Sequence, residues 1–195
     1  MTDRTNDQHR HDAPLGMKLK ELYGLIHDID VAMFTTRRAD GHLVARAMAT
    51  QAPREGADLW FVTDAESHKL DELDADPHVN VSYYRDGTRE WVSVSGTATV
   101  STDRRAIRDL YRPDWKAWFG DEGGARDGGP DDPRFALILV DAHSVSYLKV
   151  DQPRPIVLFE VVKGMVTGTR PNVGAQREIT PSELEASVAS PPDAK

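Results

Sequence analysis

Ser67 and Lys69 stand where a predicted strand gives way to a predicted helix. The stretch from Asp58 to Thr63 alternates aromatic and β-branched residues, which is typical of a strand. Thr63 and Glu66 have the spacing of a capping box, which predicts a helix start between them. Backbone N–H groups at a helix start are unpaired and attract anions. A hydroxyl and an ammonium group at this point indicate either a phosphate pocket or an ordinary helix cap beside a surface lysine.

An arginine lies in the middle of the strand predicted just upstream, at residues 43–51. In this strand Val44, Arg46, Met48 and Thr50 face one way, and the residues between them face the other way. Arg46 has two interpretations. It is either an exposed arginine whose stem lies along apolar neighbours, or a side chain aimed at a ligand phosphate, which its planar guanidinium binds with two parallel hydrogen bonds.

Composition excludes several other chemistries. The chain has 195 residues, of which 39% are hydrophobic and 29% charged, as in a soluble globular domain. The net charge of −8 argues against broad nucleic-acid or anionic-membrane binding. There is no cysteine, which excludes disulfides, thiolate nucleophiles and iron–sulfur clusters, and the seven histidines lack a metal-site spacing. We therefore predict no metal, and we expect a cytoplasmic protein because no signal peptide or membrane-spanning run is recognisable.

The remaining chain predicts a mainly β domain with appended helices. We expect a disordered leader at 1–14, a folded domain at 15–167 and a polar, flexible C-terminal tail at 168–195. Predicted strands cover 31–36, 43–51, 58–63, 79–85, 91–100, 135–141 and 145–151, and predicted helices cover 15–28, a short stretch after 66, and 103–111. Residues 156–166 fit either a strand or a short helix. Most links are too short for parallel crossovers, which favours an antiparallel barrel.

Two further features concern packing. Gly96 lies inside a predicted strand, which indicates a bulge or a close approach of another backbone. Residues 112–133 contain Trp115, Trp118 and five glycines, and we expect a mobile loop there. Its tryptophans either dock on the core or cover a pocket, and we expect at least one of them in the core.

The order of these segments resembles the flavin-binding split-barrel superfamily of pyridoxamine 5'-phosphate oxidase, and more closely its bacterial general stress protein branch. The similar sequence segments lie between residues 17 and 150. They are MFTTRRADGHLVARAMATQ, DLWFVTDAESHKLDELDADPHVNVSYY, EWVSVSGTATV, WKAWFGDEG and DDPRFALILV. This resemblance implies a mainly β (α+β) fold, a six-stranded antiparallel split β-barrel with peripheral helices. It also implies a homodimer with FMN at the subunit interface, although some members use FAD or the deazaflavin F420.

The resemblance also implies roles for single residues at the phosphate end of the flavin. Arg46 matches the strand arginine that holds the flavin phosphate, and Ser67 and Lys69 match the phosphate-binding pair at the helix start. His68 stands where the oxidases carry another arginine. Gln51 stands where they carry a lysine near the flavin ring.

Further residues match positions along the ring. Met48, Phe61 and Thr63 are implied to contact it, Trp91 to lie near the cofactor edge shared in the dimer, and Trp118 to lie over the flavin as a lid. The C-terminal arginine and histidine motif that grips pyridoxal phosphate is not recognisable. We therefore do not expect pyridoxamine phosphate oxidation.

Three functions are consistent with these features. The first is an FMN-binding general stress protein acting as a flavin-dependent oxidoreductase of unknown substrate, with NAD(P)H as a candidate donor. The second is a flavin carrier or sensor without turnover, and the related alternative is an F420- or FAD-dependent reductase. The third is an interaction domain that has lost its ligand. The flavin carries the redox chemistry in the first case, and no protein base stands out as a catalytic residue.

Overall fold

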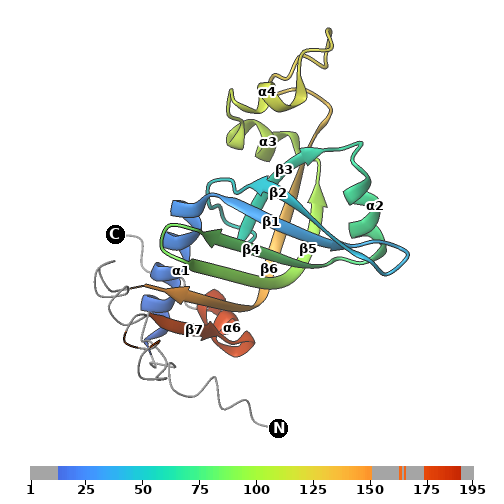
Figure 1. Cartoon of the computed structure of the whole chain (residues 1–195). Helices are drawn as coiled ribbons and strands as arrows, with labels where there is room; N and C mark the ends of the chain where they lie inside the picture. The colour runs from blue at the N-terminus through green and yellow to red at the C-terminus, as the bar shows by residue number, and fades with distance from the viewer. Residues whose placement is uncertain (1–12, 151–162, 164, 166–173, 190–195) are drawn as a thin grey trace. The chain divides into compact units, whose positions relative to one another are not determined.

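A computed structural model describes residues 13–150, 163, 165 and 174–189 (Figure 1). Its contacts divide the chain into two units. Unit 1 comprises Met1–Asp30, Ser82–Val94 and Ser144–Lys195, and unit 2 comprises Val31–Val81 and Ser95–His143. The predicted leader, up to residue 12, lies outside the described residues, as does nearly all of the ambiguous stretch 156–166.

The described strands form one mainly antiparallel sheet, which confirms the expected fold class. They are β1 (Val31–Arg37), β2 (Leu43–Ala49), β3 (Leu59–Asp64), β4 (His78–Arg85), β5 (Glu90–Ser101), β6 (Phe135–Lys149) and β7 (Ala175–Ile179). Their order is β2-β1-β4-β5-β6-β3, and β7 pairs with β6. The sheet is not closed into a barrel. Strands β2 and β3 lie at the two ends of this order, and an isolated bridge between Thr50 and Phe61, rather than a ladder, connects the end of β2 to β3.

The described helices are α1 (Leu15–Ile29), α2 (His68–Ala75), α3 (Arg104–Leu110), α4 (Trp115–Phe119) and α6 (Pro181–Ala189). None of these described helices has both the length and the apolar character needed to cross a membrane.

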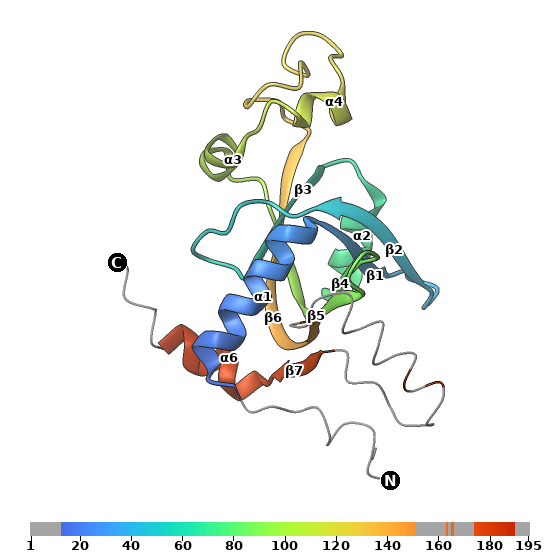
Figure 2. The ribbon, with the colours of Figure 1, turned by 60° about the vertical axis from the view of Figure 1, so that its left-hand side comes forward.

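Unit 1 contains a strand and a helix that the sequence analysis assigned to the C-terminal tail. Residues 175–189 form β7 and α6, and α1 lies beside both of them (Figure 2). The Lys18 ammonium bonds to the backbone oxygen of Glu178 at 3.0 Å and to the carboxylate of Glu183 at 2.7 Å. The tail prediction was wrong for these residues because β7 has apolar residues only at its two ends, Ala175 and Ile179, so its sequence reads as polar.

The β1–β2 hairpin places Arg46 within unit 2. The turn uses Gly41 with a φ of 87°, a conformation that glycine adopts readily. In the resulting register Phe34 on β1 lies opposite Arg46 on β2. Phe34 and Thr36 are buried, so the face of the hairpin that carries Arg46 is the face turned inward.

Strand β6 is continuous from Phe135 to Lys149, whereas the sequence analysis predicted two strands with a break at 142–144. That prediction was wrong because Ala142, His143 and Ser144, the small and polar residues at the expected break, are part of the strand. The Thr97 hydroxyl lies 3.2 Å from His143 Nε2. A Cβ atom at Gly96 would lie 2.2 Å from the Asp141 carbonyl oxygen. The close backbone approach predicted at Gly96 is therefore confirmed.

Replacing Gly96 by alanine is expected to destabilise the protein by about 1–3 kcal/mol, the usual cost of overpacking a filled site. Urea unfolding followed by circular dichroism measures this change. Gly24→Ala is the matched control, because Gly24 lies within α1 and a Cβ atom at this position would have no neighbour within 4 Å. That variant should gain about 0.5–1 kcal/mol from the better helix propensity of alanine. Equal stability of Gly96→Ala and the parent would contradict the close approach.

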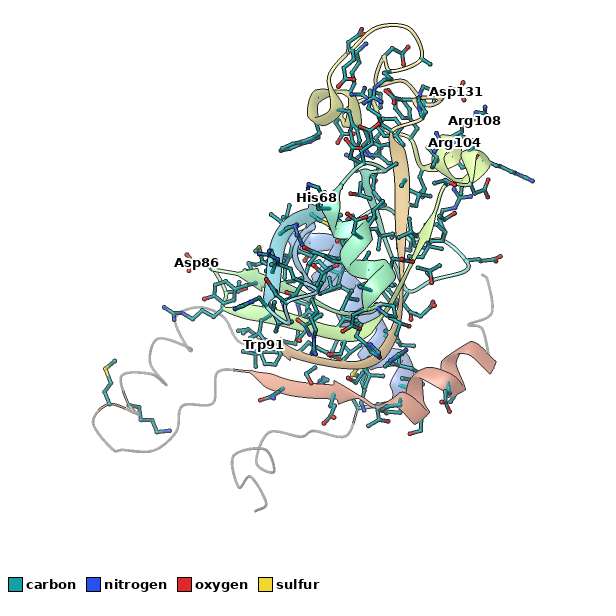
Figure 3. The ribbon with its side chains drawn as sticks, turned by 90° about the vertical axis from the view of Figure 1, so that its right-hand side faces the viewer. His68, Asp86, Trp91, Arg104, Arg108 and Asp131 are labelled. Carbon is teal, nitrogen blue, oxygen red and sulfur yellow. The ribbon has the colours of Figure 1, made fainter. Side chains whose placement is uncertain are left out.

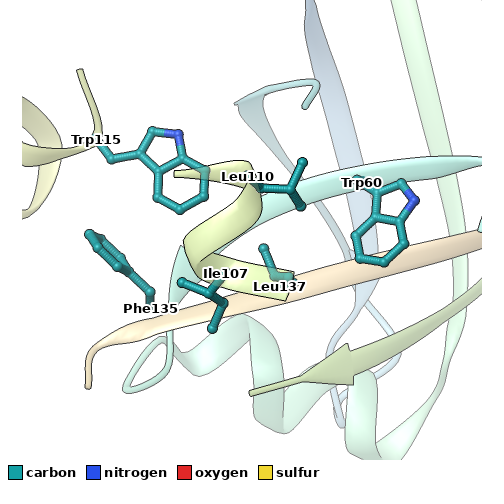
Figure 4. Close-up of a cluster of buried hydrophobic side chains, with 6 residues drawn as sticks. All are labelled: Trp60, Ile107, Leu110, Trp115, Phe135 and Leu137. Carbon is teal, nitrogen blue, oxygen red and sulfur yellow. The ribbon is translucent and has the colours of Figure 1, made fainter. Parts of the chain in front are cut away.

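A hydrophobic cluster rich in aromatic residues joins α3 and α4 to β3 and β6 within unit 2 (Figure 4). Its buried members are Trp60, Ile107, Leu110, Trp115, Phe135 and Leu137. The Trp115 and Phe135 rings meet edge to face with centroids 5.3 Å apart, a favourable aromatic geometry. This confirms that one tryptophan of the 112–133 segment belongs to the core.

The rest of that segment is anchored rather than loose. Arg134, which is buried, donates to the carbonyl oxygens of Phe119 at 2.7 Å, Gly120 at 3.0 Å and Arg126 at 3.1 Å. Its guanidinium also pairs with the fully buried Asp132 at 2.6 Å. The expectation of a mobile loop did not include these contacts. They hold the glycine-rich segment 119–126 against the buried guanidinium of Arg134.

Candidate functional site

Arg46 is held in a three-residue polar cluster within unit 2. Its guanidinium donates to the Thr36 hydroxyl at 2.8 Å and to Glu72 Oε1 at 2.9 Å. The Thr36 hydroxyl in turn donates to Glu72 Oε2 at 2.6 Å. The side chain of Arg46 is 29% exposed and that of Glu72 is 12% exposed. The guanidinium is therefore fixed in place, as it must be if it is to bind an anion with little loss of entropy.

Helix α2 supplies the second cation of the site. Lys69 lies in its first turn and donates to the Thr63 hydroxyl on β3 at 2.5 Å. Ser67 is the N-cap residue, and its hydroxyl makes no bond to the helix backbone. The predicted capping box was wrong, because Thr63 still belongs to β3 and the Glu66 N–H donates to the Asp64 carboxylate instead.

The two cations lie close enough to influence each other. Burial lowers the pKa of Lys69, and the positive charge of Arg46 lowers it further, against the opposing effects of Asp64 and Glu72. The hydrogen bond from Arg46 holds the pKa of Glu72 below its ordinary value, with a further contribution from Thr36. Two half-buried cations that repel each other form a site where an added anion would be stabilised.

Arg46 and Lys69 both have N–H donors beyond those used in their contacts with described residues. A guanidinium has five N–H donors and an ammonium has three. Arg46 uses donors toward Thr36 and Glu72, and Lys69 uses one toward Thr63. An arginine–lysine pair beside an uncapped helix start matches the chemistry of a phosphate group.

Apolar side chains lie beside this polar cluster. Phe61 is fully buried, and its ring centroid lies 5.2 Å from that of Phe34 in an edge-to-face arrangement. Met48 is also buried and lies two residues from Arg46 on the same face of β2. Because Phe34 lies opposite Arg46 in the β1–β2 register, the polar cluster lies at the edge of this buried apolar core.

Gln51 is buried at the point where β2 approaches β3. It is 5% exposed, and its backbone N–H donates to the Trp60 carbonyl at 2.7 Å. Its side-chain Nε2 donates to the Ala49 carbonyl at 3.1 Å. No donor among the described residues reaches its Oε1. A buried acceptor without a partner is uncommon in folded proteins and calls for an explanation.

Two of the predicted site residues, His68 and Trp118, have largely exposed side chains. Figure 3 shows His68 at the start of α2, where its side chain is 97% exposed and pairs with Asp71 at 3.5 Å. Trp118 on α4 is 87% exposed. Trp91 lies on the part of β5 that belongs to unit 1, and it is half-buried there.

Sequence analysis missed Glu72 and Thr36, which orient the arginine. Glu72 follows Lys69 by three residues on α2, so the helical period places both on neighbouring positions of one face. That spacing could have indicated a carboxylate beside the lysine. The inward position of Thr36 could have been read from the alternation of β1.

Comparison with known proteins identifies the family to which the chain belongs. The family model described as "Pyridoxamine 5'-phosphate oxidase like" matches residues 17–172. Protein bli-3 of Neurospora crassa is 39% identical over 178 residues, which cover 90% of this chain and 85% of that protein.

Solved structures show the same fold. A Clostridium acetobutylicum protein related to general stress protein 26 of the pyridoxinephosphate oxidase family has a TM-score of 0.62 at 14% identity, covering 88% of this chain and 99% of that chain. The general stress FMN/FAD binding protein of Xanthomonas citri has a TM-score of 0.54 at 25% identity, covering 67% of this chain and 88% of that chain.

Proposed function

Because the chain belongs to the pyridoxamine 5'-phosphate oxidase-like family, we propose that it binds FMN, with the phosphate held between Arg46 and Lys69. The observation that carries this proposal is the position of the two cations. They come from β2 and α2, they influence each other electrostatically, and each keeps donor capacity beyond its contacts with described residues. The description of the Xanthomonas citri neighbour as an FMN/FAD binding protein supports the flavin class.

The residues present fit a flavin at both of its ends. The phosphate requires cationic and N–H donors, which Arg46, Lys69 and the start of α2 provide. Glu72 orients Arg46 through one edge of the guanidinium and leaves its other donors for the ligand. The ring requires an apolar surface, for which we propose Met48 and Phe61, whose side chains are buried in the structure. FMN is favoured over FAD because the proposed site binds a terminal phosphate.

The proposed activity is that of a flavin-dependent oxidoreductase. A bound flavin supplies hydride and electron transfer, and the protein binds, orients and shields it. No general base is assigned among the chain's own residues. We propose NAD(P)H as the electron donor and a homodimer as the assembly, since family kinship and the prevalence of two-fold pairs both favour it. Pyridoxamine phosphate oxidation is not proposed.

Mass spectrometry of the small molecule released by denaturing the purified protein tests this function. We expect FMN in a near-stoichiometric amount, together with the visible absorbance of an oxidised flavin before denaturation. Steady-state oxidation of NADH or NADPH by the flavin-loaded protein then tests the reductase. Bound flavin without turnover would instead indicate a carrier or sensor. Protein that neither carries FMN nor binds added FMN would contradict the proposed function.

A further inference from the structure

The glycine-rich segment 119–126 reaches the turn at which α2 begins. The Arg126 guanidinium donates to both carboxylate oxygens of Glu66, at 2.8 Å and 3.3 Å. Glu66 directly precedes Ser67, the N-cap residue of α2. Two parallel bonds between an arginine and a carboxylate fix the direction of the carboxylate as well as its distance. Arg126 therefore determines where the Glu66 carboxylate lies relative to the start of the helix that carries Lys69.

This contact belongs to a chain of alternating charges rather than to an isolated surface pair. Arg126 Nε donates to Glu122 Oε2 at 2.7 Å, and Glu122 Oε1 lies 3.0 Å from the buried guanidinium of Arg134. The Arg134 carbonyl oxygen accepts from the N–H of Ala65, which immediately precedes Glu66, at 2.7 Å. Isolated exposed pairs hold side chains weakly, whereas networks with bidentate geometry hold them better. The position of Arg126 is therefore set by the same buried cation that anchors the glycine-rich segment.

Glu66 is an unfavourable neighbour for a bound anion unless its charge is compensated. The hydrogen bond from Arg126 and the charge of its guanidinium hold the pKa of Glu66 below its ordinary value, so the carboxylate is ionised at neutral pH. The Ser67 hydroxyl does not cap the described helix α2, and N–H groups in the first turn of a helix have no carbonyl partner within it. Such N–H groups attract carboxylates as well as phosphates. A Glu66 side chain released from Arg126 would therefore compete with a phosphate for them.

We propose that Arg126 is a positioning residue of the phosphate site, which holds the Glu66 carboxylate away from the first turn of α2 and leaves that turn to the phosphate. The inference rests on the proposed flavin function and assigns a role in it to the glycine-rich segment. Arg46 and Lys69 contact the phosphate, and Arg126 acts only through Glu66. Its effect therefore requires the carboxylate of Glu66, and it concerns ligands that carry a phosphate.

Arg126→Gln, Glu66→Gln and the double variant test this inference through their affinities for FMN and riboflavin, measured by isothermal titration at low ionic strength. Arg126→Gln is expected to weaken FMN binding about two- to fivefold, the usual effect of a charge at a helix start, and to leave riboflavin binding unchanged. The double variant should bind FMN about as tightly as the parent, because no carboxylate remains to compete. The difference between Arg126→Gln and the parent should shrink as salt is added, since salt screens exposed charges.

Arg108→Gln is the matched control, because Arg108 also pairs with an acid, Asp131, and both of these side chains are exposed. It removes the same charge from unit 2 and should leave FMN affinity unchanged. The inference is overturned if Arg126→Gln keeps the FMN affinity of the parent, if it loses FMN and riboflavin affinity equally, or if the double variant binds FMN as weakly as Arg126→Gln. An equal loss in Arg108→Gln also overturns it, since net charge would then explain the effect. A parent protein that does not bind FMN overturns the proposed function and the inference with it, before any variant is compared.

Discussion

Arg46→Ala is expected to weaken FMN binding by about 1.5–3 kcal/mol, or roughly 10- to 150-fold in the dissociation constant. The variant loses charge-assisted hydrogen bonds to the phosphate. It also leaves the carboxylate of Glu72, whose side chain is 12% exposed, without the guanidinium that now pairs with it at 2.9 Å. That carboxylate would then face the phosphate as an uncompensated like charge. Isothermal titration of the flavin-free protein with FMN measures the change.

Arg37→Ala is the matched control for this variant. Arg37 belongs to the same hairpin, but it lies on the opposite face of β1 and its side chain is 58% exposed beside Asp76. Its removal deletes the same charge from the protein without touching the cluster. FMN affinity should therefore remain within a factor of two of the parent. An equal loss in both variants would attribute the effect to net charge and would contradict a built phosphate site.

Asp132→Asn is expected to lower the melting temperature by about 10 °C, because breaking a buried ion pair leaves the other charge uncompensated. Asp132 is fully buried, and its carboxylate accepts from the Arg134 guanidinium at 2.6 Å and from the Gly128 N–H at 2.8 Å. The same guanidinium holds the carbonyl oxygens of Phe119 and Gly120. Thermal unfolding monitored by circular dichroism and by the fluorescence of the tryptophans reports the loss.

The adjacent Asp131 provides the control for Asp132. Its side chain is 69% exposed, and it pairs with Arg108, which is also exposed, at 2.5 Å (Figure 3). Exposed pairs of this kind contribute little to stability. Asp131→Asn should therefore change the melting temperature by no more than about 2 °C. Similar losses in the two variants would contradict the anchoring role assigned to the buried pair.

The effect of Asp132→Asn should also depend on pH. The Arg134 guanidinium holds the pKa of Asp132 well below its ordinary value. The folded state therefore favours the ionised carboxylate more strongly than the unfolded state does. The stabilisation is fully present above the unfolded pKa of about 4 and is lost as the pH falls below it. The difference between parent and variant should accordingly be largest near neutral pH and should shrink in acid.

Local patterns in the sequence were sufficient to predict most of the sheet. The alternation of β2 and the change from strand to helix after Thr63 both depend on neighbouring residues, and the structure places elements at both points. The merged strand β6 and the strand β7 could not be predicted in the same way. Their pairing depends on partners distant in the chain, such as Gly96 beside Asp141, which no local pattern reveals.

The candidate site was predictable to a similar extent. Residue type and strand alternation pointed to Arg46 and Lys69, and the structure brings them into one electrostatic environment. The roles of Glu72 and Thr36 were missed because a glutamate on a helix and a threonine on a strand ordinarily face solvent. His68 and Trp118 were chosen from the resemblance alone, and their side chains are turned to solvent. Those assignments remain predictions for the flavin-bound protein.

The central claim is tested most directly by comparing FMN with riboflavin, which carries the same ring without the phosphate. The dissociation constants of both ligands are measured for the parent, Arg46→Ala and Lys69→Ala. The account predicts that the parent prefers FMN strongly and that each variant loses most of that preference while riboflavin affinity hardly changes. An undiminished preference for FMN in both variants would show that the phosphate binds somewhere other than between Arg46 and Lys69.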